Sequence, residues 1–179
     1  MMGPLWKSRT IWLLGILLCT VGGLATASSV PQPVRETLPA AAQASRVVLR
    51  VESGGKEIRW TLAQLEALGT YRVTTRTYWP DDNGTYEGPL LSAVLKASGL
   101  DPATRVRVLA RDGFSQVVPS EDLTSWPLML ATRRDGQPLD LARKGPLRII
   151  YPRDMDPRLE APVYRLRWVW MVDRIEAAP

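Results

Sequence analysis

Short segments separated by turn signals dominate this chain and limit it to a fold built largely from short strands. Arg46–Glu52 alternates apolar and polar residues, Ser53-Gly54-Gly55 is typical of a tight turn, and Lys56–Thr61 reads as the returning strand. Segments rich in β-branched and aromatic residues predict further strands at residues 71–79, 105–110, 114–118, 128–134, 147–151 and 164–177.

The predicted helices are few and short. Thr61 and Gln64 form a capping-box pattern ahead of an apolar repeat that stops at Gly69. A second helix is predicted between Pro89 and Gly99, and residues 119–123 predict a short helical turn. Strands with a few helices favour an α+β, mixed β class over an alternating βαβ array.

The N-terminal segment has the features of a secretory signal peptide. Lys7 and Arg9 precede an apolar run over residues 11–18, and Ala25-Thr26-Ala27 is a typical cleavage site. The run is too short to favour a membrane-spanning helix, so we expect cleavage after Ala27, although an uncleaved anchor is the alternative. Because no Arg-Arg pair precedes the apolar run, the signal resembles the general secretory type. It predicts a periplasmic or secreted protein with no stable membrane span.

Two further segments follow the predicted signal peptide of residues 1–27. Residues 28–45 are rich in Ala, Pro, Ser and Gln and predict a flexible linker. Residues 46–179 predict a single globular domain.

Removal of the signal peptide would leave a chain with little metal-binding or nucleophilic chemistry. The chain has no histidine, and its one cysteine, Cys19, lies within the predicted signal. A Cys/His zinc site, a Ser-His triad, a cysteine nucleophile and a disulfide are therefore excluded from the predicted mature chain. The formal charge of +5 falls to about +3 without Lys7 and Arg9, which is too small to indicate a nucleic-acid partner.

Asp135-Gly136 is a hairpin turn signal inside the stretch Leu130–Leu139, and this stretch belongs to a larger pattern. Four blocks in order, "YEGPLLSAVLKASGL", "DGFSQVVPSEDL", "LMLATRRDGQPLDLARKGPLRIIYP" and "YRLRWVWMVDRIEA", resemble segments of the sulfite oxidase family. The resemblance runs from about Thr61 to Glu176. It implies a sulfite-oxidase-type molybdopterin-binding fold, with the Leu130–Leu139 hairpin close to the cofactor cleft.

The resemblance also implies which residues line the cleft. In catalytic members a cysteine thiolate binds molybdenum on the strand before the second helix, where this chain offers Thr75, Arg76 and Thr77 and no thiol. A family tyrosine matches Phe114, a family histidine matches Lys144, and two family cations match Arg148 and Arg167. The predicted ligand-cleft residues are Thr77, Tyr86, Phe114, Arg148 and Arg167; no catalytic residue and no metal ligand is predicted.

Several of these residues also allow a purely structural interpretation. Strand alternation permits Arg148 to face solvent. Trp168 and Trp170 favour a core or interface role over a ligand cage. Asp81-Asp82 indicates a solvated turn rather than a metal site, and the loop with Asp154, Asp156 and Glu160 indicates a surface loop.

Three functional hypotheses follow. The first is a non-catalytic member of the family that binds a small anionic ligand or a periplasmic protein partner. The second is a genuine molybdopterin-dependent oxidoreductase whose metal is held by the pterin dithiolene alone, and the third is a structural adaptor without a ligand. No cofactor is expected under the first hypothesis, although the resemblance implies molybdopterin. Molybdopterin enzymes generally leave the cytoplasm folded through a twin-arginine signal, so the signal type also favours the first hypothesis.

Overall fold

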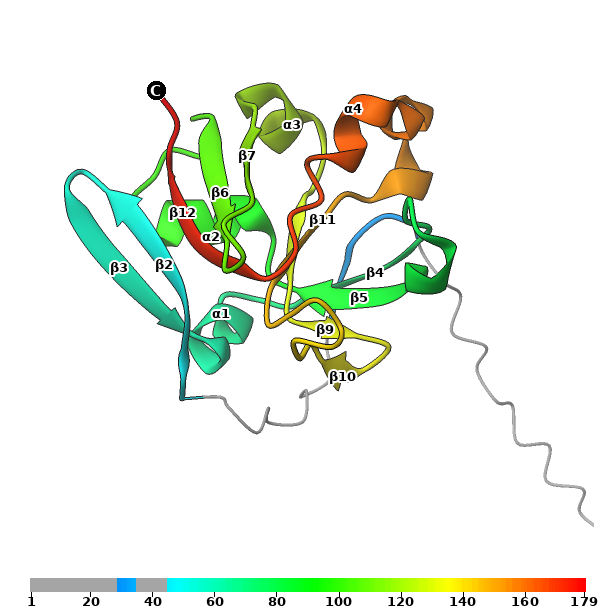
Figure 1. Cartoon of the computed structure of the whole chain (residues 1–179), viewed down its shortest axis with the longest axis horizontal. Helices are drawn as coiled ribbons and strands as arrows, with labels where there is room; N and C mark the ends of the chain where they lie inside the picture. Colours follow the sequence, from blue (N-terminus) through cyan, green and yellow to red (C-terminus); the bar gives the residue numbers. More distant parts are fainter. Residues whose placement is uncertain (1–28, 35–44) are drawn as a thin grey trace, which may run out of the picture.

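The computed structural model describes residues 29–34 and 45–179, which form three sheets with short helices (Figure 1). The predicted signal peptide and residues 35–44 of the predicted linker lie outside the described residues. The mixture of sheets and short helices confirms the predicted α+β class.

One five-stranded sheet has the spatial order β1-β4-β5-β9-β10, with antiparallel neighbours throughout. Its strands are β1 (Gln32–Pro33), β4 (Tyr71–Thr75), β5 (Gly84–Gly88), β9 (Arg133–Arg134) and β10 (Gln137–Pro138). Asp135 and Gly136 close the β9–β10 hairpin with φ angles of 52° and 74°. Two positive φ angles are what a two-residue hairpin turn of this kind requires, so the predicted turn is confirmed.

A second five-stranded sheet has the order β3-β2-β12-β6-β7, and a two-stranded sheet pairs β11 with β8. These strands are β2 (Val47–Ser53), β3 (Lys56–Thr61), β6 (Val106–Ala110), β7 (Ser115–Val118), β8 (Met129–Ala131), β11 (Arg148–Ile150) and β12 (Val172–Ala177). β12 runs parallel to β2 and antiparallel to β6, so the C-terminal strand lies at the centre of its sheet.

The helices are short and connect these strands. The α-helices are α1 (Leu62–Ala67), α2 (Leu91–Ala97), α3 (Ser120–Ser125) and α4 (Pro162–Arg165), and the 3₁₀ helices are η1 (Pro80–Asp82), η2 (Arg153–Met155) and η3 (Pro157–Glu160). The predicted capping box of α1 is present, with Thr61 and Gln64 bonding reciprocally. Across residues 29–34 and 45–179, every helix is too short or too polar to traverse a bilayer.

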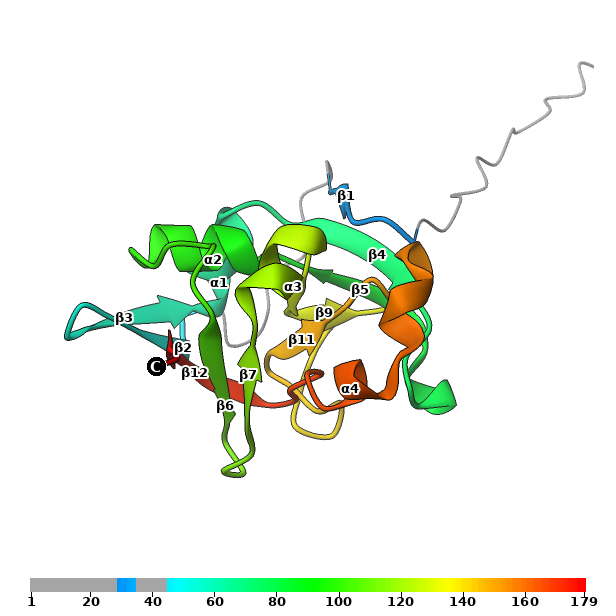
Figure 2. The same ribbon diagram turned by 90° about the horizontal axis from the view of Figure 1, so that it is seen from above.

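The apolar core joins all three sheets. Val51, Val108 and Ile175 point into it from the second sheet, and Val73 does so from the first. β11 lies between the two larger sheets in both views (Figures 1 and 2), and its residues are fully buried. This central position matters because β11 carries Arg148.

The structure corrects three element predictions. Within 164–177 only β12 is a strand, because Pro162 favours a helical first turn and Met171, with φ of 50°, interrupts the extended backbone. The strand predicted over 71–79 ends at Thr75, and η1 and β5 follow it. Gln32–Pro33, inside the predicted flexible linker, pairs with β4 instead.

Candidate functional site

Asp82, at the end of η1, is the buried centre of a cluster of three cations. Arg148 binds it with both guanidinium ends: Nη1 donates to Oδ1 at 3.0 Å, and Nη2 donates to Oδ2. Arg134 Nη1 donates to the same Oδ1 at 2.9 Å, and Lys144 Nζ lies 3.5 Å from Oδ2. The prediction that Asp81-Asp82 is a solvated turn is therefore wrong for Asp82, since its carboxylate is buried among three cations.

Tyr86 on β5 completes this cluster. Its hydroxyl donates to the Asp82 carbonyl at 2.5 Å and accepts from Arg148 Nη1 at 3.3 Å. Burial raises the pKa of Tyr86 to about 12, so the hydroxyl stays protonated. Burial would also raise the pKa of Asp82, but the hydrogen bonds and charge of Arg148, with Lys144 and Arg134, outweigh it and lower that pKa. Asp82 is thus a permanent carboxylate at neutral pH.

Arg148 has no solvent exposure, which contradicts the interpretation that strand alternation turns it toward water. Its guanidinium carbon lies 5.3 Å from the Tyr86 ring centroid and 5.7 Å from that of Trp170. The predicted cleft residues Tyr86 and Arg148 are therefore in direct contact. The positive charge of Arg148 and the hydrogen bonds of both side chains are directed mainly to Asp82.

Arg167 belongs to a separate group. Its Nη1 donates to Asp122 Oδ2 at 2.7 Å, and the Tyr151 hydroxyl donates to the same oxygen at 2.7 Å. Burial and the Asp122 carboxylate raise the pKa of Tyr151 far above its usual range. The structure places Arg167 with α3 and the residue after β11, and Arg167 and Arg148 share none of their hydrogen-bond partners.

Thr77, a fourth predicted cleft residue, is buried inside a backbone turn. Its hydroxyl donates to the Trp79 carbonyl at 2.7 Å, and its N–H donates to Asn83 Oδ1 at 2.7 Å. These bonds hold the 79–83 segment over the cluster. The arrangement makes Thr77 a positioning residue rather than one that is free for a ligand.

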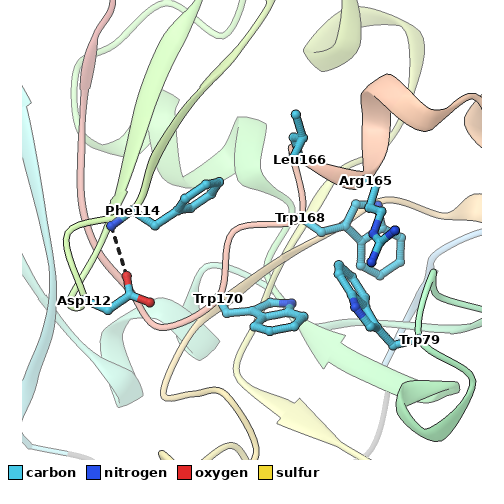
Figure 3. A pocket seen from close by; sticks show the side chains of 7 residues that line it. All are labelled: Trp79, Asp112, Phe114, Arg165, Leu166, Trp168 and Trp170. Carbon is cyan, nitrogen blue, oxygen red and sulfur yellow. Dashed lines mark hydrogen bonds between the residues drawn. The ribbon is translucent and has the colours of Figure 1, made fainter.

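An open pocket lies beside the Asp82 cluster, and we call it the tryptophan pocket. Its volume is about 270 Å³, and it is lined by Trp79, Asp112, Phe114, Arg165, Leu166, Trp168 and Trp170. Figure 3 shows Phe114 entering from the β6–β7 turn, Trp170 beneath, and Trp79 with Trp168 on the opposite side. The Trp79 and Trp170 ring centroids are 4.6 Å apart, so these two side chains form one continuous wall.

Cations lie against the walls of this pocket. Lys144 Nζ is 3.9 Å from the Trp170 ring centroid and 5.6 Å from that of Trp79. The guanidinium of Arg165, on α4, lies 5.4 Å from the Trp79 centroid. Cations at these distances interact favourably with indole faces. Trp170 therefore connects the pocket to the Asp82 cluster on its other side.

The tryptophans have a role that the sequence interpretation only partly anticipated. Trp168 is buried in the core, as expected, but both Trp168 and Trp170 also line the pocket. Trp79 and Arg165 were not among the predicted cleft residues. The aromatic pair Tyr78-Trp79 directly before a Pro-containing turn was the one local signal for Trp79, whereas Arg165 was hidden by the strand predicted over 164–177.

The residues present do not fit a thiolate-held molybdenum centre. Neither cysteine nor histidine occurs in the part of the chain that the structure describes. The Thr75 hydroxyl donates to the Arg76 carbonyl at 3.1 Å, and that of Thr77 is used as described above. A hydroxyl is also a poor substitute for a soft thiolate. Within residues 29–34 and 45–179, no group of three or more Cys, His, Asp or Glu side chains has an arrangement suited to a metal ion.

Comparison with known proteins agrees with this architecture. Among solved structures, the chain is similar to the sulfane dehydrogenase SoxCD from Paracoccus pantotrophus, with a TM-score of 0.57 and 17% sequence identity. The alignment covers 78% of this chain but 39% of that one, so the likeness concerns the fold alone. A search of curated proteins found no match. Residues 36–176 match the family described as the oxidoreductase molybdopterin binding domain, and the chain therefore belongs to this family.

Proposed function

We propose that this chain is a non-catalytic member of its family that binds a small anionic ligand in the tryptophan pocket. The observation that carries the proposal is the pairing of an open aromatic pocket with a cation cluster whose members are already bound to Asp82. A buried bidentate arginine–carboxylate pair is costly to separate, so the cluster is better suited to shaping the pocket than to receiving a ligand itself.

The charge around the pocket favours an anion. Arg165 lies at its rim and Lys144 behind its tryptophan wall, while Asp112 is the one carboxylate among the lining residues. The Asp112 Oδ1 atom already accepts the Phe114 N–H at 3.0 Å. Positive potential focused in a concave site attracts anionic ligands and raises their association rate.

The location follows from the N-terminal sequence. A basic start, a short apolar run and Ala25-Thr26-Ala27 support export by the general secretory route to the periplasm or the medium. A chain exported unfolded would have to meet any cofactor outside the cytoplasm, which agrees with a non-catalytic role.

Metal and pterin analysis of the natively exported protein tests the non-catalytic part of the proposal. We expect far less than one molybdenum per chain and no pterin fluorescence after denaturation. About one molybdenum per chain would instead support the alternative of an oxidoreductase with metal held by the dithiolene alone.

A thermal-shift screen tests the binding part. Carboxylates, sulfonates and phosphates should include compounds that raise the melting temperature, because a ligand that binds only the folded state stabilises it. Arg165→Gln should reduce that shift, and Arg105→Gln, at an exposed arginine outside the pocket, should not. A protein that responds to none of these anions would favour the adaptor hypothesis.

A further inference from the structure

The hydrogen-bonding groups of the tryptophan pocket are mostly donors. The indole N–H groups of Trp168 and Trp170 are buried and have no hydrogen-bond partner among the described residues. Buried donors in folded proteins are nearly always paired, so the two unpaired N–H groups show that this region is short of acceptors. Their nitrogen atoms have almost no solvent exposure, so a ligand in the pocket would contact the indole rings rather than the N–H groups themselves.

Arg165 adds a third, charged donor. Its side chain is exposed, it lies over Trp79, and it forms no ion pair or hydrogen bond within residues 29–34 and 45–179. Other arginines also contact aromatic rings, but their guanidinium groups have carboxylate partners: Arg148 binds Asp82, Arg153 binds Glu160 and Arg167 binds Asp122. The guanidinium of Arg165 is therefore available for a carboxylate, in the bidentate geometry that its planar fork favours.

The walls select for a flat ring. Phe114 and Leu166 are 44% and 57% exposed and line the same pocket, and apolar side chains that gather at one site, unlike those scattered singly, indicate a binding site. In Figure 3 the Phe114 ring faces Trp168 and Trp79 across the pocket, with Trp170 forming its floor. Aromatic rings at such walls gain from offset or edge-to-face contacts with another aromatic ring, beyond the burial of apolar area.

The size of the pocket limits the ligand. A volume of about 270 Å³ lies below the range of roughly 300–1,000 Å³ for pockets that hold drug-sized molecules. One or two fused rings with a single acidic group suit this space. A large cofactor would have to extend well outside it.

From these observations we infer that the ligand class of the tryptophan pocket is a small planar aromatic carboxylate. Its ring lies against Phe114 and the tryptophan walls, and its carboxylate binds Arg165. This inference rests on the proposed function and narrows it from anions in general to one chemical class.

Titration calorimetry with three matched probes tests the inference. The probes are 2-naphthoate, the saturated decahydro-2-naphthoate, which keeps the charge but loses the flat ring, and 2-naphthamide, which keeps the ring but loses the charge. We expect 2-naphthoate to bind at least about tenfold more tightly than 2-naphthamide, since a charge-assisted hydrogen bond contributes at least that factor. It should bind about two- to tenfold more tightly than decahydro-2-naphthoate, which keeps the charge but loses the aromatic contacts.

Two substitutions assign the contacts. Arg165→Gln should weaken 2-naphthoate binding about tenfold and leave 2-naphthamide binding unchanged. Trp170→Phe keeps an aromatic wall but replaces the indole by a smaller ring, and it should weaken binding of 2-naphthoate. Arg105→Gln serves as the matched control for Arg165, and unchanged melting temperatures would show that the variants are folded.

The outcomes separate the two proposals. If decahydro-2-naphthoate or 2-naphthamide binds as tightly as 2-naphthoate, the aromatic-carboxylate inference is overturned, although anion binding in general can stand on the thermal-shift screen. If Arg165→Gln binds 2-naphthoate as the unsubstituted protein does, the inference is likewise overturned. If neither 2-naphthoate nor any anion of the screen binds, the inference and the proposed function both fail.

Discussion

Asp81 and Asp82 illustrate how two neighbouring carboxylates of the same type acquire different roles. Asp81 is exposed, while Asp82 is 4% exposed and binds Arg148, which follows 66 positions later in the chain. No local pattern distinguishes the two, because the partners of Asp82 come from β9, β11 and the loop that carries Lys144. The difference is created by tertiary structure alone.

Replacing Asp82 by Asn should strongly destabilise the protein. The substitution retains the shape of the side chain but leaves the guanidinium of Arg148, which is fully buried, without its counter-charge. Removing one partner of a buried ion pair costs about 3–5 kcal/mol. Urea unfolding should show this loss, whereas Asp81→Asn should change the free energy of unfolding by less than about 0.5 kcal/mol. Equal effects of the two substitutions would contradict the burial argument.

The stability contribution of Asp82 should also depend on pH. Its pKa is lowered in the folded protein, so its contribution is present above the unfolded pKa of about 4 and is lost as the pH falls through the lower folded value. The difference in melting temperature between the unsubstituted protein and Asp82→Asn should therefore shrink between about pH 5 and pH 2. A difference that stays constant across that series would mean that Asp82 is not held as a carboxylate.

At the scale of elements, local signals predicted turns and caps well and predicted long-range partners poorly. The capping box of α1 and the Asp135-Gly136 hairpin depend on residues within a few positions of one another, and both are present. Strand β5 was not predicted, because Gly84–Gly88 has few β-forming residues and exists through pairing with β4 and β9. Its pairing brings Tyr86 into the core.

Gly88 at the end of β5 shows why a poor strand former is needed there. A Cβ atom at Gly88 would lie 2.3 Å from the Leu130 carbonyl oxygen and 2.9 Å from the Ala131 Cα, both of which are backbone atoms of the β8 region. Because backbone cannot move aside as a side chain can, residue 88 must be glycine for β5 and β8 to approach. This contact positions the strand that pairs with β11.

Gly88→Ala should therefore destabilise the protein by about 1–3 kcal/mol, the usual cost of overpacking a core. Gly84→Ala is the matched control, since its Cβ would meet only the side-chain ends of Arg134 and Asp135, at 3.0 Å. Melting curves of the two variants would check this. A Gly88→Ala variant as stable as Gly84→Ala would show that β5 and β8 can separate without cost.

At the scale of the whole molecule, the candidate site could be predicted only in part. The family resemblance located Tyr86, Arg148 and Phe114 near one region, and the structure brings Tyr86 and Arg148 into contact while Phe114 lines the adjoining pocket. Arg167 is elsewhere, bound to Asp122. The pocket itself combines the turn before β5, the β6–β7 turn and the segment after α4, and such a convergence of distant segments has no signature within any one of them.

The first strand bears on how the chain would be processed under the proposed export. Cleavage after Ala27 would leave Gln32 and Pro33 in the mature chain, where they pair with Arg72 and Tyr71 of β4, and would keep the bond from the Val34 N–H to the Thr70 carbonyl. A cut beyond residue 34 would remove this edge strand and expose the backbone groups of β4.

The intact mass of protein from the periplasmic fraction should therefore correspond to a chain that begins at Ser28. Ala27→Leu should slow this processing, because the cleavage site requires a small residue, whereas Ala42→Leu, in the predicted linker, should leave it unchanged. A mature protein that begins at Met1 would contradict the predicted signal peptide, and one that begins beyond Val34 would contradict the role of β1 in the mature fold.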